Sequence, residues 1–244
     1  MFCRRGCSSC AMTKELLSSW GVEFDLVDVE GDPAAQRELE RLGVPVAPAV
    51  AVGERAVHGW DPAAYAALLG IAYAAPARLP PPALAARLDG IIEATERLVG
   101  ALRLVHLDHR PPQRDRSVRD LAFHVFRLSL AFVDGMDMGR VPEAWLRETA
   151  PAELVDGPEV ARYGALVRGR VGGWFEGAGA GEYARVIDAP CGPLTGHELL
   201  ERTTWHAAQH LRQLHALAEG LGAAPEPPLS GSLFEGLPLP GSLW

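Results

Sequence analysis

The sequence contains no apolar run of the roughly 18 residues that a membrane span needs, and its first residues lack the apolar stretch of a secretory signal. Lys14 is its single lysine, and a net charge of −8 gives a nucleic-acid partner no electrostatic support. It has only four cysteines, which stay reduced in a cytoplasm unless they are catalytic. These features predict a cytoplasmic protein without a membrane segment or a nucleic-acid partner.

The length and composition are sufficient for two domains. The 244 residues are 48% hydrophobic, which leaves ample material for packed cores. The proline-rich stretch at residues 75–82 can hold neither a helix nor a central strand. We therefore predict a first domain over 1–72, a linker over 73–81, a second domain over 82–222, and a proline- and leucine-rich C-terminal strap over 223–244 that ends on Trp244.

Short β runs alternate with single helices in the first domain. Residues 23–29 alternate as a strand, and residues 49–58 resemble a hairpin around a Gly-Glu turn. Helices are predicted over 10–20, 33–42 and 62–69. This order, behind a helix that carries Cys-x-x-Cys, predicts a thioredoxin-like α/β layer.

Beyond the prolines the hydrophobic pattern changes to long helical periods. Four helices are predicted, over 82–107, 117–135, 158–176 and 196–220. Their number and length predict an all-α four-helix bundle.

The motif Cys7-Ser8-Ser9-Cys10 stands where a loop becomes a helix. Unpaired N–H groups there favour a thiolate at Cys7, while Cys10 lies one turn inside as the resolving thiol. Half of a structural zinc site is the alternative, but this half of the chain has no second Cys pair or Cys/His pair at zinc spacing. A thioredoxin fold needs a cis-proline before its third strand, and Pro48 is placed for it, with Pro45 as the alternative.

The first domain resembles the glutaredoxin family over about residues 1–72. The resemblance is carried by Cys3-Arg4-Arg5-Gly6-Cys7-Ser8-Ser9-Cys10, Ala47-Pro48-Ala49-Val50 and Gly59-Trp60-Asp61-Pro62. The last stretch is similar to the small glutaredoxin-like electron donors of ribonucleotide reductase. The resemblance implies Cys7 as nucleophile, Cys10 as resolving cysteine and Pro48 as the substrate-binding cis-proline.

One departure from the family concerns the first strand. Family members have a full strand before the motif, whereas only Met1-Phe2-Cys3 precede Arg4 here. We expect either a first strand reduced to a stub or a true start upstream of this Met1. Cys3 is then a small apolar residue at the end of that strand, or an extra thiol beside the motif.

Three histidines of the second domain lie on apolar helix stripes. His206 and His210 are spaced i and i+4 on the last helix, about 5–6 Å apart at Cβ, and His124 lies on the apolar stripe of the second. A single inward histidine is more often a hydrogen-bonded core residue. Three unpaired imidazoles in one apolar core would each have a desolvation cost of at least about 1–3 kcal/mol. One metal ion bound by all three would remove this cost.

Residues 82–222 resemble the DinB/YfiT-like superfamily. The resemblance is carried by Arg119-Asp120-Leu121-Ala122-Phe123-His124 and by His206-Ala207-Ala208-Gln209-His210-Leu211-Arg212-Gln213-Leu214. It implies that His124, His206 and His210 are metal ligands, with Gln213 a frequent companion of no settled role. Characterised members include metal-dependent transferases and isomerases that use low-molecular-weight thiols such as mycothiol or bacillithiol.

These patterns lead to one functional hypothesis and a rival. The hypothesis is a thiol-metabolism fusion: a glutaredoxin-like dithiol oxidoreductase joined to a metal-dependent thiol transferase, isomerase or hydrolase. Three imidazoles with an open position suit one divalent ion, with Zn²⁺ expected and Ni²⁺, Fe²⁺ or Mn²⁺ possible. The expected partners are a small thiol and an electrophile or disulfide. The rival is a non-enzymatic metal-binding or dimerising bundle, as a possible homodimer, on a redox carrier or sensor.

For several other residues the sequence supports only a general prediction. The histidine ligands are expected to be oriented by one or more of Asp120, Glu201 and Gln209. Cys191 is expected to be a plain loop residue, with a redox role as the alternative. His106, His109, His197 and His215 are expected to be structural or exposed.

Overall fold

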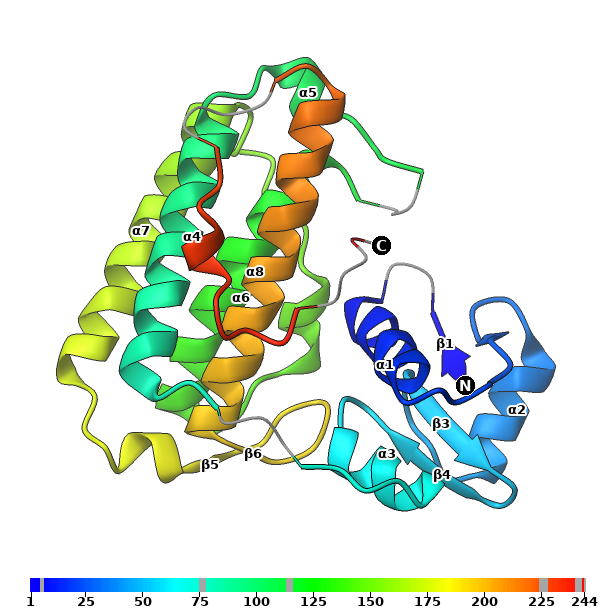
Figure 1. The fold of residues 1–244 in the computed structure, drawn as a ribbon. Coiled ribbons are helices and arrows are strands. Elements are labelled where there is room, and N and C mark those ends of the chain that lie inside the picture. Colours follow the sequence, from blue (N-terminus) through cyan, green and yellow to red (C-terminus); the bar gives the residue numbers. More distant parts are fainter. Residues whose placement is uncertain (5–6, 75–77, 113–115, 224–227, 240–242, 244) are drawn as a thin grey trace. The chain divides into compact units, whose positions relative to one another are not determined.

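The chain divides into two units, the first within residues 1–77 and the second from Arg78 to Leu239. The computed structural model describes residues 1–4, 7–74, 78–112, 116–223, 228–239 and 243. The first unit is a small sheet with helices packed on it, and the second is a helical bundle (Figure 1). This confirms the predicted fold classes.

The sheet of the first unit has the strand order β2-β1-β3-β4. β1 (Phe2–Cys3) runs parallel to β2 (Val27–Asp28) and antiparallel to β3 (Ala49–Val52). β3 and β4 (Arg55–His58) form an antiparallel hairpin with Val50 opposite Val57. The hairpin has the predicted position, because its Gly-Glu turn is flanked by two runs of β-forming residues.

The prediction of a strand over residues 23–29 is too long, and β2 contains only two residues. β1 is equally short: Phe2 pairs with Val27 and Cys3 with Asp28. A segment without a neighbouring strand cannot form ladder hydrogen bonds, so the preceding residues remain outside the sheet.

Three described helices pack on this sheet, namely α1 (Ser8–Ser19), α2 (Pro33–Arg41) and α3 (Pro62–Leu69). Figure 1 shows α1 and α3 on one side of the sheet and α2 on the other. Asp32 and Asp61 cap α2 and α3 by accepting backbone N–H bonds, and a proline follows each cap. The core between these layers includes Phe2, Cys10, Leu17, Leu39, Ala49, Val50, Tyr65 and Leu68.

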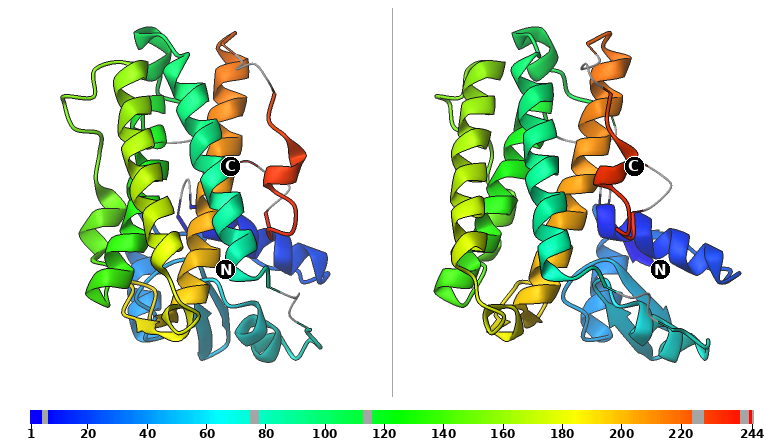
Figure 2. Two further views of the ribbon diagram at one scale, coloured as in Figure 1. Left: turned by 90° about the vertical axis from the view of Figure 1, so that its left-hand side faces the viewer. Right: turned by 60° about the vertical axis from the view of Figure 1, so that its left-hand side comes forward.

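The second unit is built on four long helices: α4 (Pro81–Gly100), α6 (Val118–Met138), α7 (Gly157–Gly177) and α8 (Gly196–Gly220). α4 and α6 each pack against both α7 and α8, and the four run side by side in Figure 2. No helix in the described parts of the chain is long and apolar enough to cross a membrane. The shared core includes Leu84, Leu88, Ile91, Leu121, Phe126, Phe132, Leu211 and Leu214.

α7 packs closely against α4 and α6 at Gly164, which is buried. A Cβ atom placed there would lie 2.5 Å from the Cζ atom of Phe126 and 2.9 Å from the Cγ atom of Glu96. A Cβ at Gly169, on the same helix, would meet nothing within 4 Å. Gly164 therefore permits the close packing of α7, whereas Gly169 has no such role.

The first helix of the bundle ends earlier than predicted. Instead of one helix over 82–107, α4 stops at Gly100 and a separate short helix, α5 (Leu104–Leu107), follows. Glycine is a poor helix former. The Nδ1 atom of His106 accepts the backbone N–H of Arg103 at 3.3 Å, which starts the new helix. His106 is thus a structural residue, as expected.

The C-terminal residues 228–239 lie along α4 and α8 (Figures 1 and 2). Leu237 is buried in the bundle core, and the indole N–H of Trp205 donates to the carbonyl of Pro238 at 3.0 Å. This segment therefore covers part of the bundle surface. The expected end on Trp244 lies outside the described residues.

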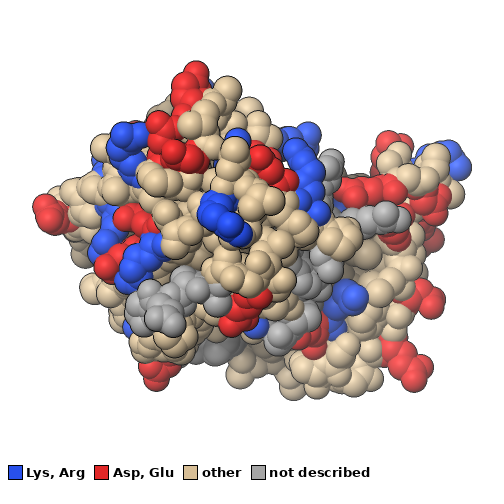
Figure 3. Space-filling model, turned by 90° about the horizontal axis from the view of Figure 1, so that it is seen from above, with Lys and Arg blue, Asp and Glu red and all other residues tan. Residues whose placement is uncertain are grey.

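Acidic and basic side chains are interspersed over the face of the molecule shown in Figure 3. Within the bundle, the guanidinium of Arg168 forms two hydrogen bonds with Asp89, at 2.6 and 2.8 Å, and lies 3.4 Å from Glu93. Arg127, which is buried, pairs with Glu148. These arginines are neutralised locally by carboxylates.

Candidate functional site

The dithiol lies at the start of α1. Cys7 is the N-cap residue, and its Sγ atom accepts the backbone N–H of Cys10 at 3.2 Å. Cys7 is half-buried, whereas Cys10 is buried with 4% of its surface exposed. Arg5 and Gly6 of the predicted motif lie outside the described residues. Cys7 is therefore the more accessible of the two sulfur atoms.

The two thiols differ in acidity as well. A hydrogen bond from the Cys10 thiol lowers the pKa of Cys7 to about 7, although burial acts in the opposite direction. The backbone N–H groups of Cys10 and Ser9 and the charge of Arg4 also lower it. The same hydrogen bond and burial raise the pKa of Cys10 far above its usual range. Near neutral pH, Cys7 is thus the thiolate and Cys10 the thiol.

Two further predicted residues belong to this unit. The Ala47–Pro48 peptide bond is cis, and the carbonyl of Pro48 accepts the N–H of Gly59 at 2.8 Å. Cys3 lies in β1, where burial and the neighbouring Asp28 raise the pKa of its thiol. Cys3 is therefore a weaker nucleophile than Cys7 near neutral pH.

The three predicted histidines come together within the bundle. His124 is on the second turn of α6, and His206 and His210 are on consecutive turns of α8. One ring nitrogen from each lies within 4.8 Å of the others, so the group could hold a metal ion. His124 and His210 are buried, with 6% and 1% of their surface exposed, and His206 is half-buried.

The ring geometry suits a shared ion. The Nε2 atoms of His206 and His210 are 3.0 Å apart, and the ring of His124 is centred 5.1 and 5.4 Å from theirs. Two nitrogens that each bind a metal ion at about 2.0–2.1 Å are separated by about 2.8–3.0 Å in octahedral geometry and about 3.3–3.4 Å in tetrahedral geometry, an interval of about 2.8–3.4 Å. The observed separation falls in this interval, and neutral imidazoles are a donor set that Zn²⁺, Ni²⁺, Fe²⁺ and Mn²⁺ accept.

A glutamine lies behind one of the three rings. The Oε1 atom of Gln213 is 2.7 Å from Nδ1 of His210, and 1% of the Gln213 surface is exposed. Sequence reasoning left Gln213 without a role. The i, i+3 spacing from His210 was the available signal, since it places both side chains on one face.

The groups predicted to orient the ligands have other contacts. Asp120 accepts the hydroxyl of Ser117 at 2.7 Å and the N–H of Ala150 at 3.1 Å. Glu201 pairs with Arg78 at 3.2 Å. The helical spacing of Asp120 and Glu201 gave no indication that they would contact these residues instead of an imidazole.

Gln209 accepts a hydrogen bond from Arg212 at 2.8 Å. Away from the three rings, His215 lies 3.5 Å from Glu219, and Cys191 is a half-buried loop residue.

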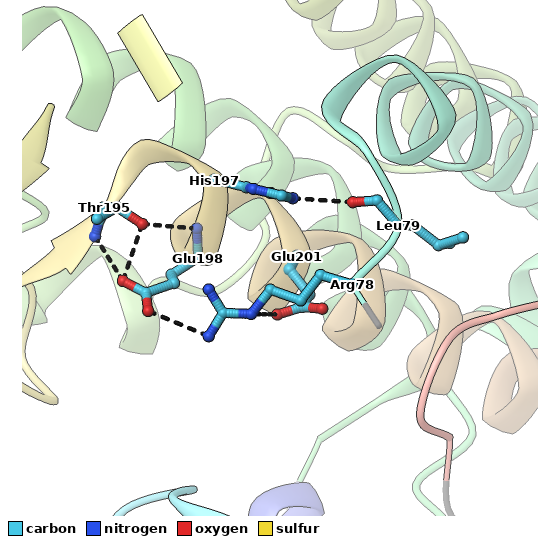
Figure 4. A network of polar contacts seen from close by, with 6 residues as sticks. All are labelled: Arg78, Leu79, Thr195, His197, Glu198 and Glu201. Atoms are coloured by element: carbon cyan, nitrogen blue, oxygen red, sulfur yellow. Dashed lines mark hydrogen bonds and ion pairs between the residues drawn. The ribbon is translucent and has the colours of Figure 1, made fainter. Parts of the chain in front are cut away.

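The helix that carries two of the histidines begins at a capping box, drawn in Figure 4. Thr195 Oγ1 accepts the N–H of Glu198 at 3.2 Å, and Glu198 accepts the N–H of Thr195 at 2.9 Å. Arg78 pairs with Glu198 at 3.1 Å, and His197 Nε2 contacts the Leu79 carbonyl at 2.8 Å. The segment that enters α4 is thereby held to the first turn of α8.

The fold and these sites define a thiol-redox unit joined to a helical bundle with a three-histidine cluster. A family model described as the DinB superfamily matches residues 87–214. This is more than half of the chain, so the chain belongs to the DinB superfamily. A model described as glutaredoxin matches residues 1–57, so the first unit is glutaredoxin-like.

Comparison with solved structures finds a DinB-like protein from Bacillus subtilis. It is 17% identical, with a TM-score of 0.47, over 57% of this chain and 92% of the other. No curated protein matches the chain.

Proposed function

We propose that this protein is a fusion enzyme of thiol metabolism, in which a dithiol oxidoreductase is joined to a metal-dependent enzyme that activates a small thiol or water. The observation that carries the redox half is the position of Cys7 at the N-cap of α1, where its Sγ atom accepts the backbone N–H of Cys10 at 3.2 Å. This position and the lowered pKa of Cys7, about 7, favour a thiolate near neutral pH. The convergence of three imidazoles supports the metal-dependent half.

The redox step follows from the difference between the two cysteines. The Cys7 thiolate attacks one sulfur of a substrate disulfide, the S–S bond breaks, and the other sulfur leaves as a thiolate. Cys10 then loses its proton to solvent and attacks Cys7, which releases the second substrate thiol and leaves a Cys7–Cys10 disulfide. An external thiol must reduce that disulfide to complete the cycle.

In the bundle, His124, His206 and His210 would hold one divalent ion, with Zn²⁺ as the proposed metal. Such an ion, when bound, supplies a Lewis acid that lowers the pKa of a coordinated thiol or water. The low-molecular-weight thiol is a co-substrate, and an electrophile is the second substrate. The three histidines leave at least one coordination position for these groups.

The fusion of the two domains supports a joint role. Linking two sites in one chain raises the effective concentration of a product of one site at the other. The redox unit would then reduce a mixed disulfide of the same thiol that the bundle uses.

The decisive experiment measures metal per chain in the purified protein and in the double variant His206→Ala with His210→Ala. We expect one divalent ion per chain at most, lost in the variant and lost from the native protein as the pH falls below about 6.5. His215→Ala, on the same helix, is the control and should retain the metal. If the double variant keeps its metal, the site lies elsewhere and the proposal fails.

An empty site is distinguished from an absent one by titration. Zn²⁺, Ni²⁺ and Mn²⁺ are added to the metal-free protein and its melting temperature is followed. Binding to the native state alone stabilises it by about 2.7 kcal/mol at a free-ion concentration of 100 Kd. A screen of small thiols with electrophiles then tests catalysis, and metal binding without turnover would favour a non-enzymatic bundle.

A further inference from the structure

We infer that Gln213 is a positioning residue that holds His210 in the tautomer with its proton on Nδ1, so that the Nε2 lone pair faces the other two histidines. This inference rests on the proposed metal site. It adds a residue of this chain that prepares one ligand before any ion arrives.

The contact is short and shielded from water. Gln213 Oε1 and His210 Nδ1 are 2.7 Å apart, and 1% of the surface of each residue is exposed. An amide oxygen has lone pairs and no proton, so it can only accept a hydrogen bond. Nδ1 must therefore be the donor, and a neutral imidazole with its proton on Nδ1 has a lone pair on Nε2.

The position of Nε2, on the opposite edge of the ring, shows why the tautomer of His210 affects metal binding. Nε2 of His210 lies 3.0 Å from Nε2 of His206, at the place where the three rings converge. A proton on Nε2 of His210 would point into this space and block coordination there. The acceptor at Nδ1 excludes that tautomer and fixes the rotation of the ring about its Cβ–Cγ bond.

The neutral amide also suits its surroundings. A carboxylate at this depth would add a buried charge whenever the metal is absent, whereas glutamine accepts the same hydrogen bond without charge. The metal-free bundle therefore keeps the ligand oriented without an unpaired buried ion.

The test compares two substitutions of buried polar side chains on α8. Gln213→Leu removes the acceptor behind His210, and Thr204→Val removes a buried hydroxyl that donates to the carbonyl of Leu200 at 2.8 Å. Zn²⁺ affinity is measured by competition with a chromophoric chelator. Gln213→Leu should weaken binding by about 10- to 100-fold, and Thr204→Val should change it less than about threefold. Gln213→Glu, which restores an acceptor, should return the affinity to within about tenfold of the native value.

A second readout needs no metal. Ring ¹⁵N chemical shifts of the metal-free protein should show the Nδ1–H tautomer at His210, and Gln213→Leu should abolish this preference. Unchanged Zn²⁺ affinity in a folded Gln213→Leu protein would overturn the inference, as would an Nε2–H tautomer at His210 in the native protein. If the native protein binds no metal at all, the proposed function fails, and the tautomer measurement still decides the role of Gln213.

Discussion

Cys7 and Cys10 lie one helical turn apart, and the hydrogen bond that joins them shifts their pKa values in opposite directions. The thiol of Cys10 donates to the thiolate of Cys7, which favours the charged form of one and the neutral form of the other. With a pKa of about 7, Cys7 is about one tenth thiolate at pH 6 and about nine tenths at pH 8. Its alkylation rate should therefore rise through this interval with a midpoint near pH 7.

Substitution of Cys10 tests the cause of this acidity. Cys10→Ser keeps a donor, so the midpoint of Cys7 alkylation should stay near pH 7. Cys10→Ala removes it, and the midpoint should rise by about one to two pH units, since a hydrogen bond to a charged group contributes about 1.5–3 kcal/mol. The rate of iodoacetamide labelling against pH, resolved by peptide mass, measures both. Equal midpoints in the two variants, or preferential labelling of Cys10 in the native protein, would contradict the assignment.

The histidine cluster shows which features of the site could be predicted from the sequence and which could not. Helical spacing was enough to predict that His124, His206 and His210 point into one bundle interior, because the stripes of apolar neighbours show which way each ring faces. The partner of His210 could not be predicted in this way. Asp120, Glu201 and Gln209 were the candidates to orient the rings, and helical spacing does not determine which side chain contacts an imidazole. Asp120 and Glu201 have partners in a loop and in the α4 entry segment, which the helical pattern does not encode.

At the scale of elements, two glycines of α7 should respond oppositely to the same substitution. Gly164→Ala places a methyl group against the ring of Phe126, which is fully buried and has no room to move, and should lower the free energy of unfolding by about 1–3 kcal/mol. Gly169→Ala adds a methyl group in open space and improves helix propensity, so it should raise that free energy by about 0.5–1 kcal/mol. Urea unfolding of both variants measures the difference. A stabilising Gly164→Ala would show that α7 does not pack as described.

The elements that were predicted correctly are those whose signals are local. The hairpin at 49–58 and the helix at 62–69 are set by a turn, an aspartate cap and a proline next to one another. In the sheets, the errors arose where a distant partner decides the outcome. β2 is short because β1 offers it only two residues. The small hairpin of β5 (Val186–Ile187) and β6 (Leu194–Thr195) has strands too short to show periodicity.

For the whole molecule, the two units should differ in stability. The first has strands of only two to four residues. The second has four helices of 20 to 25 residues around a large apolar core. Small units bury a smaller fraction of their surface, so less free energy opposes their opening.

Hydrogen–deuterium exchange followed by mass spectrometry tests this difference. Amides of β1–β4 and α1–α3 should exchange faster than those of α4, α6, α7 and α8 under native conditions. The amides of α6 and α8 near the three histidines should slow further when Zn²⁺ is added, and those of the first unit provide the internal control. Equal protection of both units without metal would mean that another segment or a partner completes the small sheet.

The placement of the three ligands on α6 and α8 has a consequence for the topology of the chain. An ion held by His124 together with His206 and His210 is a cross-link, and it closes the loop that runs from residue 124 to residue 206. All of α7 lies within that loop. By loop-closure entropy, a permanent cross-link of this span raises the free energy of the unfolded chain by about 4.5 kcal/mol, as a disulfide would. Unlike a disulfide, this cross-link opens when the imidazoles are protonated. The bundle would therefore have a reversible cross-link that acid or a chelator removes without breaking a disulfide or any other bond of the chain.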